Sequence, residues 1–192
     1  MARIGMQYLV FAPITAEANN SITYGTGVKA DHARRGAITY NKDDATLYGD
    51  DTVAEHVVTT IDADIEIETT ELSNAVATLL GLERVKSGTG DSAVYTMATE
   101  NLTPVGCGFI QTHIVNGVKS YRAIWFHKVT FSPDNEESNT KEETIDWGTP
   151  TITGKAWSVN LDATGVPQIR DYKDCETLAA AQTWLKGLAN IT

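Results

Sequence analysis

The 192-residue sequence predicts a mainly β protein of the α+β class with two helices. Three features lead to this prediction. Residues 61–68 alternate apolar and acidic side chains, the period-two pattern of a strand with one buried face. Asn116-Gly117 separates two long extended runs, a strong signal for a β-hairpin. Helical periodicity is found at residues 70–80 and in a second segment near the C-terminus.

The first element is expected to be a strand at residues 8–14. This apolar stretch is short for a secretion signal and is interrupted by Pro13, so we do not expect a signal peptide. Residues 40–51 form a polar segment with four aspartates and no core periodicity. We expect this segment to be a hairpin tip or a long loop.

In the strand at residues 61–68, one face is apolar and is expected to be buried: Ile61, Ala63, Ile65 and Ile67. The other face carries the acidic row, defined as Asp62, Asp64, Glu66 and Glu68. Carboxylates spread along one solvated strand have no evident reason for a shifted pKa, so a catalytic pair is not indicated. Two interpretations remain open, a solvated sheet face and a functional acidic wall.

A helix is predicted directly after this strand, at residues 70–80. Its apolar stripe is Leu72, Ala75, Val76, Leu79 and Leu80. Thr69 or Thr70 is expected to cap the first amides, and Gly81 to end the helix in a left-handed conformation. The stripe is expected to pack on the apolar face of a sheet.

The Asn116-Gly117 turn is predicted to join strands at residues 105–115 and 118–131. Gly106 and Gly108 suggest a bulge or a close backbone approach in the first strand. In the second strand, one face is expected to hold Tyr121, Ala123, Trp125, Val129 and Phe131, and the other Val118, Arg122, Ile124, Phe126 and Lys128. Both faces are partly apolar, so a neighbouring subunit is expected to cover part of one of them.

The remaining residues suggest a C-terminal extension. Residues 134–143 are expected to be an exposed polar loop, and residues 144–147 and 150–157 short strands. Gly165 and Pro167 mark a break, after which Asp174 is expected to cap a helix that runs to about residue 189 and carries Leu178, Ala181, Leu185 and Leu188 on one side. The expected domain is therefore residues 1–157, followed by an extension at residues 158–192.

Composition excludes several functional classes. The formal net charge of −10 argues against a tight nucleic-acid binder, because such proteins gain affinity by replacing counterions with Lys and Arg. No apolar run approaches the roughly 20 residues that cross a bilayer. Cys107 and Cys175 lie far apart, which fits a reducing compartment. His32, His56, His113 and His127 show no metal-binding spacing, so neither a catalytic residue nor a cofactor or metal is expected.

Several segments resemble a known family. They are QYLVFAPITAE and ITYGTG near the N-terminus, the acidic-apolar strand that leads into a helix ending in LLGLE, and YRAIWFHKVTF followed by TKEETIDW and TPTITGKAW. Together, over about residues 1–157, they resemble the major tail tube proteins of long, non-contractile phage tails. The resemblance implies a β-sandwich or partial barrel flanked by a helix, with no enzymatic activity and no cofactor.

The resemblance also implies a function and partners. Six subunits would close into a ring, and rings would stack into a hollow tube around a tape-measure protein. Tail terminator and baseplate or tip proteins would bind the ends of the tube, and DNA would pass through without specific binding. The protein would be part of the virion, assembled in the host cytoplasm, with no membrane span.

Three sets of candidate residues follow. The acidic row is a candidate lumen wall, because carboxylates repel phosphate. The polar segment is a candidate inter-ring contact through Tyr40, Asp43, Asp44, Tyr48, Asp50 and Asp51. The long strand is a candidate subunit interface through Arg122, Ile124, Phe126 and Lys128.

Other functional classes remain as alternatives. A β-sandwich module that binds carbohydrate or protein would need an exposed aromatic platform, for which the candidates are Trp125, Trp147, Trp157 and Trp184. A small hydrolase would need a convergent set of catalytic side chains, and the sequence indicates none. A tube subunit of a contractile injection or secretion system would share the same fold logic.

Overall fold

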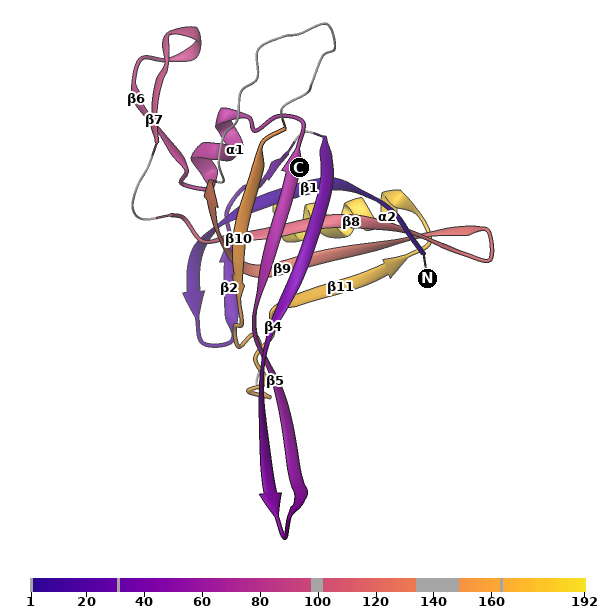
Figure 1. Cartoon of the computed structure of the whole chain (residues 1–192). Helices are drawn as coiled ribbons and strands as arrows, with labels where there is room; N and C mark the ends of the chain where they lie inside the picture. The colour runs from indigo at the N-terminus through magenta and orange to yellow at the C-terminus, as the bar shows by residue number, and fades with distance from the viewer. Residues whose placement is uncertain (1, 31, 98–101, 134–148, 163) are drawn as a thin grey trace, which may run out of the picture.

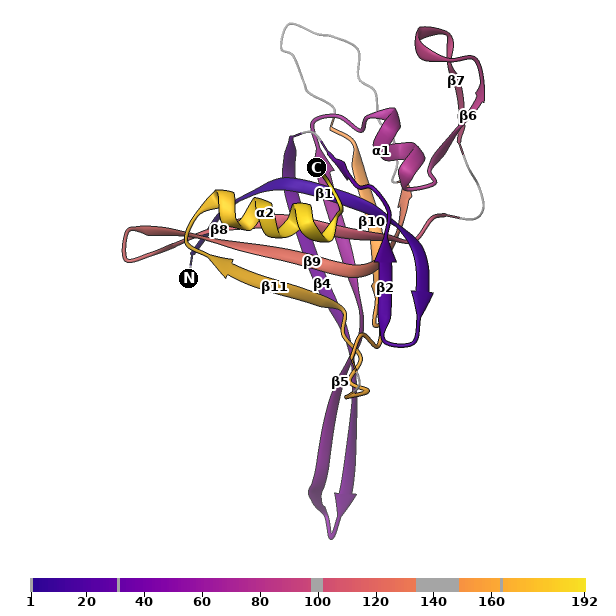
Figure 2. The same cartoon turned by 180° about the vertical axis from the view of Figure 1, so that it is seen from behind.

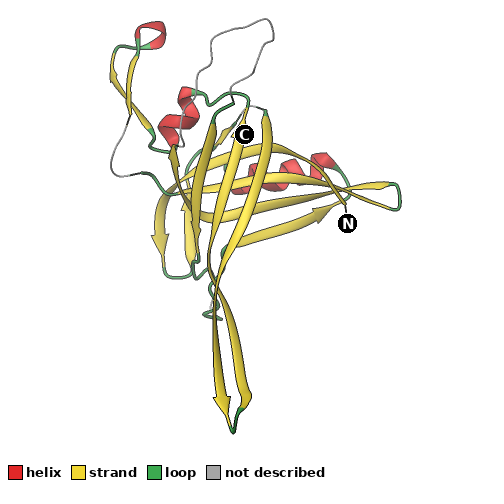
Figure 3. Ribbon diagram, viewed as in Figure 1, coloured by secondary structure: helices red, strands yellow, loops and turns green. Residues whose placement is uncertain are grey.

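The computed structural model describes residues 2–30, 32–97, 102–133, 149–162 and 164–192 (Figure 1). Most of these residues lie in strands, which confirms the mainly β prediction (Figure 3). The strands are β1 (Ala2–Ala18), β2 (Ser21–Tyr24), β3 (Val28–Lys29), β4 (Ala33–Gly49), β5 (Thr52–Thr69), β6 (Glu83–Ser87), β7 (Val94–Met97), β8 (Val105–Val115), β9 (Val118–Pro133), β10 (Thr151–Trp157) and β11 (Arg170–Cys175). The helices are α1 (Asn74–Leu79), a short 3₁₀ turn (Gly90–Ser92) and α2 (Leu178–Leu188).

One antiparallel sheet forms the body of the molecule. Its strand order is β2-β1-β8-β9-β10-β5-β4, with β3 paired to β1 and β11 paired to β9. The sheet curls so that its last strand, β4, returns toward β1, and the side chain of Met6 packs directly on Gly36. The result is a partial barrel that β4 and β1 bring near closure without pairing.

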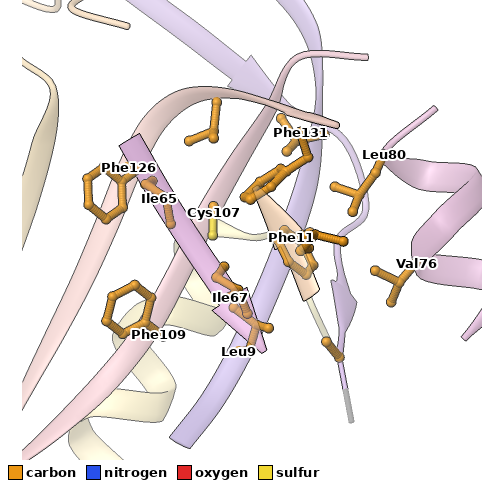
Figure 4. Packing of buried hydrophobic residues seen from close by; sticks show 14 of the residues in the cluster. Leu9, Phe11, Ile65, Ile67, Val76, Leu80, Cys107, Phe109, Phe126 and Phe131 are labelled. Carbon is orange, nitrogen blue, oxygen red and sulfur yellow. The ribbon is translucent and has the colours of Figure 1, made fainter. Parts of the chain in front are cut away.

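The main core lies inside this curl (Figure 4). Its largest side chains come from strands far apart in the sequence, and Phe11 and Phe131 meet edge to face with their ring centroids 5.4 Å apart. Helix α1 covers one end of the core with Val76, Ala77 and the following Leu80, all of which are buried. The apolar face of β5 contributes Ala63, Ile65 and Ile67.

Helix α1 is shorter than predicted and begins at Asn74, not at residue 70. The amide nitrogens of Thr69 and Thr70 donate to the carbonyl oxygens of Pro150 and His32, both at 3.1 Å, so these threonines still belong to the sheet edge. The predicted cap at Thr69 or Thr70 is therefore wrong, and Ser73 is the N-cap residue. The predicted end is confirmed, because Gly81 follows the helix with φ +75°.

A second core lies on the outer face of the sheet, under α2 (Figure 2). Ala181 and Leu185 of the helix pack on Ala123 and Trp125 of β9, while Leu178 and Leu188 are partly buried beside them. The predicted apolar side of this helix is confirmed. The helix begins three residues later than its predicted Asp174 cap would place it, because Asp174 lies in β11 and Thr177 is the N-cap.

The β8–β9 hairpin forms as predicted. Asn116 and Gly117 both have positive φ, 51° and 79°, as a type I′ turn requires. Both expectations for the glycines are also confirmed: the register shifts between Val105 and Cys107, and a Cβ on Gly108 would lie 2.6 Å from Trp125 Cε3.

This register shift corrects the predicted faces of β9. Val105 pairs with Val129 while Cys107 pairs with Phe126, so the step between these two pairs spans three residues of β9 but only two of β8. The extra residue reverses the alternation beyond Phe126. Val129 and Phe131 therefore join Ile124 and Phe126 in the main core instead of sharing a face with Trp125.

The C-terminal extension is integrated into the body. Strand β11 lengthens the sheet beside β9, and α2 covers the second core, so residues 158–192 share packing with residues 1–157. The strand predicted at residues 150–157 is confirmed as β10. The loop and strand predicted at residues 134–143 and 144–147 lie outside the described residues.

Candidate assembly surfaces

A long β-hairpin projects from the body (Figure 1). We call residues 42–61 the β4–β5 arm, because every side chain described in this range is exposed. Asp50 and Asp51 form the turn at its tip, both with positive φ. Eight residues of β4 lie in the arm, which corresponds to a reach of about 26 Å at about 3.3 Å per residue.

The arm exposes an unusual amount of apolar surface. Six large apolar side chains are 52–69% exposed: Leu47, Tyr48, Val53, Val57, Val58 and Ile61. Cross-strand partners share a face. Apolar residues occur in the Tyr48–Val53 pair and also in the Ala45–Val57 pair, which lies three residues away along β4 on the opposite face. Neither face is therefore covered by the body of the molecule.

The arm corrects part of the sequence prediction. Residues 40–49 are strand, so the long-loop alternative is wrong and the hairpin alternative is confirmed. Tyr40 lies in the body, where its ring packs against the main core and the Arg170 guanidinium lies 5.4 Å from its centroid. Asp43, Asp44, Tyr48, Asp50 and Asp51 do lie on the arm and are exposed. The predicted inter-ring contact omitted the apolar residues that β5 adds to the arm. The valines at positions 53, 57 and 58 are the feature of the sequence that could have indicated them.

The acidic row lies on the outer face of β5, opposite the core-facing Ile65 and Ile67. The alternation predicted for this strand is confirmed from Ala63 onward but fails at Ile61, which is 52% exposed. Ile61 is the extra residue of a bulge, because Asn41 pairs with Asp62 and Lys42 pairs with Thr60. It also lies beyond the pairing of β5 with β10, which ends at Asp62.

Asp62 is buried, not solvated as predicted. Its carboxylate accepts a hydrogen bond from Asn41 Nδ2 at 2.6 Å and lies 3.1 Å from Lys155 Nζ. The hydrogen bond from Asn41, followed by the interaction with Lys155, lowers the pKa of Asp62 from its ordinary value. Asp62 is therefore held as a carboxylate inside a polar cluster.

The other members of the acidic row also have partners. Asn41 donates to Asp64 at 2.8 Å, Arg35 pairs with Glu66, and Arg34 Nη1 lies 3.0 Å from Glu68 Oε1. Three basic side chains thus accompany four carboxylates, which leaves a formal charge of −1. An open surface cavity of about 340 Å³ lies beside the row and is lined by residues that include Asp64, Glu66, Thr130 and Lys155.

The predicted interface on β9 is corrected in part. The side chains of Ile124 and Phe126 are 0% exposed in the main core, because the curl of the sheet encloses this face within one chain. They are not available to a neighbouring subunit. The polar pair stays near the surface: Arg122 holds Asp174 with two hydrogen bonds of 2.7 and 2.8 Å, and Lys128 Nζ lies 2.7 Å from Glu17.

Strand β11, which the sequence analysis missed, has an unpaired edge among the described strands, since it pairs only with β9. Its sequence RDYKDC has no apolar alternation that could have predicted a strand. Tyr172 projects from it and is 57% exposed, with the Arg122 guanidinium 4.6 Å from its ring centroid. This edge is a second candidate surface for pairing with another chain.

Tyr24, His127 and Asp171 lie together at the junction of β2, β9 and β11. Tyr24 donates to the carbonyl oxygen of His127 at 2.9 Å, and burial raises the pKa of Tyr24 to about 12. Burial also lowers the pKa of His127, although Asp171, 3.5 Å from its Nε2, acts in the opposite direction.

Burial raises the pKa of the Cys107 thiol, so it is protonated and a poor nucleophile. Within the described part of the chain, no group of three or more His, Cys, Asp or Glu side chains could hold a metal ion.

Neither a protein-family model nor a curated protein matches the chain. Across the described residues, no helix has the length and apolarity needed to cross a membrane.

Proposed function

We propose that this protein is a structural subunit that polymerises with copies of itself into a hollow tube. In the form that the resemblance implies, six subunits form a ring, rings stack around a tape-measure protein, and the tube conducts DNA during genome delivery. The observation that carries this proposal is the β4–β5 arm, which exposes large apolar side chains on both of its faces.

An arm of this composition needs a partner. A two-stranded ribbon is marginally stable in water, because it buries too little apolar surface to offset the conformational entropy that its residues lose. Contiguous exposed apolar surface on a soluble protein usually marks a site of association. A neighbouring copy of the chain would cover Leu47, Tyr48, Val53, Val57 and Val58, so the arm would become ordered on stacking.

The sheet edges support association within a ring. Strand β11 lies beside the central strand β9, and β2 lies at one end of the strand order; each pairs with a single described strand. An edge strand that adds to the sheet of a neighbour satisfies its free backbone groups and generates a heterologous contact, which closes into a ring when the rotation permits. Arg122 and Lys128 lie near the surface beside these strands and remain candidates for the interface.

In such a tube the acidic row would face the lumen if α2 faced outward; this orientation is supported by the position of β5 and α2 on opposite sides of the body (Figure 2). The ion pairs reduce its field, so the row would contribute less to a negative bore than four bare carboxylates would. The surface would still offer few free cations to phosphate, which is what a conduit for DNA requires.

A β-sandwich binding module is the principal alternative. One tryptophan of the described residues is well exposed, Trp157 at 46%, and Lys155 lies 5.9 Å from its ring centroid. Trp125 is fully buried and Trp184 packs on the second core, while Trp147 lies outside the described residues. A flat platform of several aromatic rings therefore finds no support among the tryptophans that are described.

Electron microscopy of the concentrated purified protein tests the proposal. We expect rings or tubes with a central hole. In a matched variant, residues 43–59 are replaced by Asn-Gly, so that a two-residue turn joins Lys42 to its register partner Thr60. This variant should remain folded and soluble but should not elongate into tubes. Tubes of normal length from the shortened variant would contradict the role of the arm, and a wild-type protein that stays monomeric under all conditions would contradict the proposal itself.

A further inference from the structure

A second hairpin projects from the end of the molecule opposite the β4–β5 arm. We call residues 83–97 the β6–β7 arm; it is a separate two-stranded sheet beside α1 (Figures 1 and 2). We propose that the β4–β5 arm of one subunit packs on the β6–β7 arm of a subunit in the adjacent ring. This inference rests on the axial assembly proposed above and identifies the surface that receives the arm.

The β6–β7 arm has the apolar surface that such a contact requires. Val85, Val94, Tyr95 and Met97 are 51%, 50%, 37% and 62% exposed. Val85 and Tyr95 are register partners, so they share one face of the ribbon. Like the β4–β5 arm, this ribbon is too small to be stable through its own contacts. Packing the two ribbons together would remove apolar surface of both from water.

The charges of the two arms favour contact between unlike arms. The β4–β5 arm carries five carboxylates and one lysine, a formal charge of −4 with His56 neutral. On β6, Arg84 and Lys86 are exposed and form no ion pair with a described residue. The β6–β7 arm also has two carboxylates: Glu83 is partly buried at the base of the arm, and Asp91 lies at its tip. A contact between two β4–β5 arms would place like charges together, whereas contact with β6 would place cations beside carboxylates.

The geometry of the two arms fits an open axial polymer. A contact between different surfaces at opposite ends of a molecule is heterologous, and repetition by translation leaves a free arm at each end of the stack. Each new ring therefore presents the same receiving surface to the next one. Arg34, another exposed cation, is less suited to receive the arm because it already pairs with Glu68.

Cysteine cross-linking between differently labelled chains tests the proposal. One chain carries Leu47→Cys on the β4–β5 arm, and the other carries Tyr95→Cys on the β6–β7 arm. The native Cys107 and Cys175 are buried, so they should react little with the cross-linker. After co-assembly and treatment with a short bis-maleimide, we expect a covalent dimer of one chain of each kind. A matched control pairs Leu47→Cys with Val118→Cys, since Val118 lies at the β8–β9 turn and is 69% exposed.

Charge reversal provides a second measurement. Arg84→Glu with Lys86→Glu, and separately Asp43→Lys with Glu55→Lys, should each slow tube elongation about tenfold or more, because each places like charges in the contact. A mixture of the two variants contains complementary arms at the interface between unlike subunits and should elongate faster than either variant alone.

The outcomes separate this inference from the proposed function. Tubes that contain the Leu47→Cys to Tyr95→Cys cross-link, together with rescue by mixing, support both. Tubes that form with neither the specific cross-link nor rescue would overturn the inference and leave axial assembly standing. A protein that forms no rings or tubes would overturn the proposed function, and with it the inference.

Discussion

At the scale of single residues, the second core depends on the absence of side chains at two glycines of β8. The indole of Trp125 lies across Gly106 and Gly108, and Leu185 of α2 packs from above. A Cβ on Gly108 would lie 2.6 Å from Trp125 Cε3 and 2.8 Å from Leu185 Cδ2. The glycines thus allow an aromatic side chain to pack directly on the backbone of the neighbouring strand.

Gly108→Ala should therefore destabilise the protein by about 1–3 kcal/mol, because the indole and the helix must move to accommodate a methyl group. Chemical denaturation followed by tryptophan fluorescence measures the change. Gly187→Ala is the matched control: a Cβ there meets nothing within 4 Å, and alanine in a helix should be neutral or stabilising by up to about 1 kcal/mol. Equal stability of Gly108→Ala and the wild type would show that the indole is not held against β8.

His127 is the second residue with a measurable consequence. Burial lowers its pKa below the value of about 6.5 that it has in the unfolded chain, so in the window between the two values the unfolded state binds more protons. The stabilising contribution of the neutral imidazole is therefore complete above about pH 6.5 and is lost as the pH falls below that value.

The free energy of unfolding should decrease between about pH 7 and pH 5, and His127→Gln should flatten this dependence, because glutamine does not titrate. Denaturation curves over this range measure the slope. Asp62, Asp162 and Asp174 have lowered pKa values, so their protonation affects stability only at lower pH. An unchanged slope in the variant would mean that His127 does not carry the effect.

At the scale of elements, both helices begin later than their sequence patterns predict, and the reason is the same. The residues expected to cap them are engaged in the sheet: the amides of Thr69 and Thr70 bond to the sheet edge, and Asp174 pairs with Arg122 across β11 and β9. Long-range pairing therefore competes with capping and sets the helix boundaries. In α2 the cap is Thr177, whose Oγ1 accepts a hydrogen bond from the amide of Ala180 at 3.3 Å.

Thr177→Ala should reduce the stability of the protein by about 1 kcal/mol, because the variant loses this cap while leaving the packing of α2 unchanged. Thermal or chemical denaturation measures the loss. Thr177→Ser keeps the hydroxyl and should restore most of it. If serine and alanine had the same effect, the contribution of Thr177 would arise from its methyl group and not from the cap.

At the scale of the whole molecule, the body and the arms differ in how their apolar side chains are covered. The body is closed by its own elements, because α1 covers the inner core and α2 covers the outer one. The two arms extend from opposite ends with apolar side chains exposed. The body therefore covers its own apolar side chains while the arms do not, which is what the proposed polymeric function requires.

Truncation after Trp157 should unfold the protein or leave it in an expanded state, because it removes β11 and α2 from the second core. Burial of each large apolar side chain contributes about 1.5–3 kcal/mol, and a domain has only about 5–15 kcal/mol of net stability. Near-ultraviolet circular dichroism and binding of a hydrophobic dye would detect the change. The variant with the shortened β4–β5 arm is the control and should retain a native spectrum. A folded, soluble truncated chain would show that residues 1–157 form an independent domain.

Local patterns in the sequence were sufficient to predict the elements whose signals are local. The alternation from Ala63 to Ile67, the Asn-Gly turn and the apolar side of α2 each follow from the spacing of a few adjacent residues, and all were predicted. Tertiary structure decided what depends on distant partners: the bulges that turn Ile61 outward and Phe131 inward, the ion pairs of the acidic row, and the burial of Ile124 and Phe126. The tertiary structure also leaves Val53, Val57 and Val58 of β5 exposed, although their sequence pattern does not distinguish them from buried strand residues. Periodicity reports which side chains share a face, whereas the element that covers that face is brought there by contacts between residues far apart in the chain.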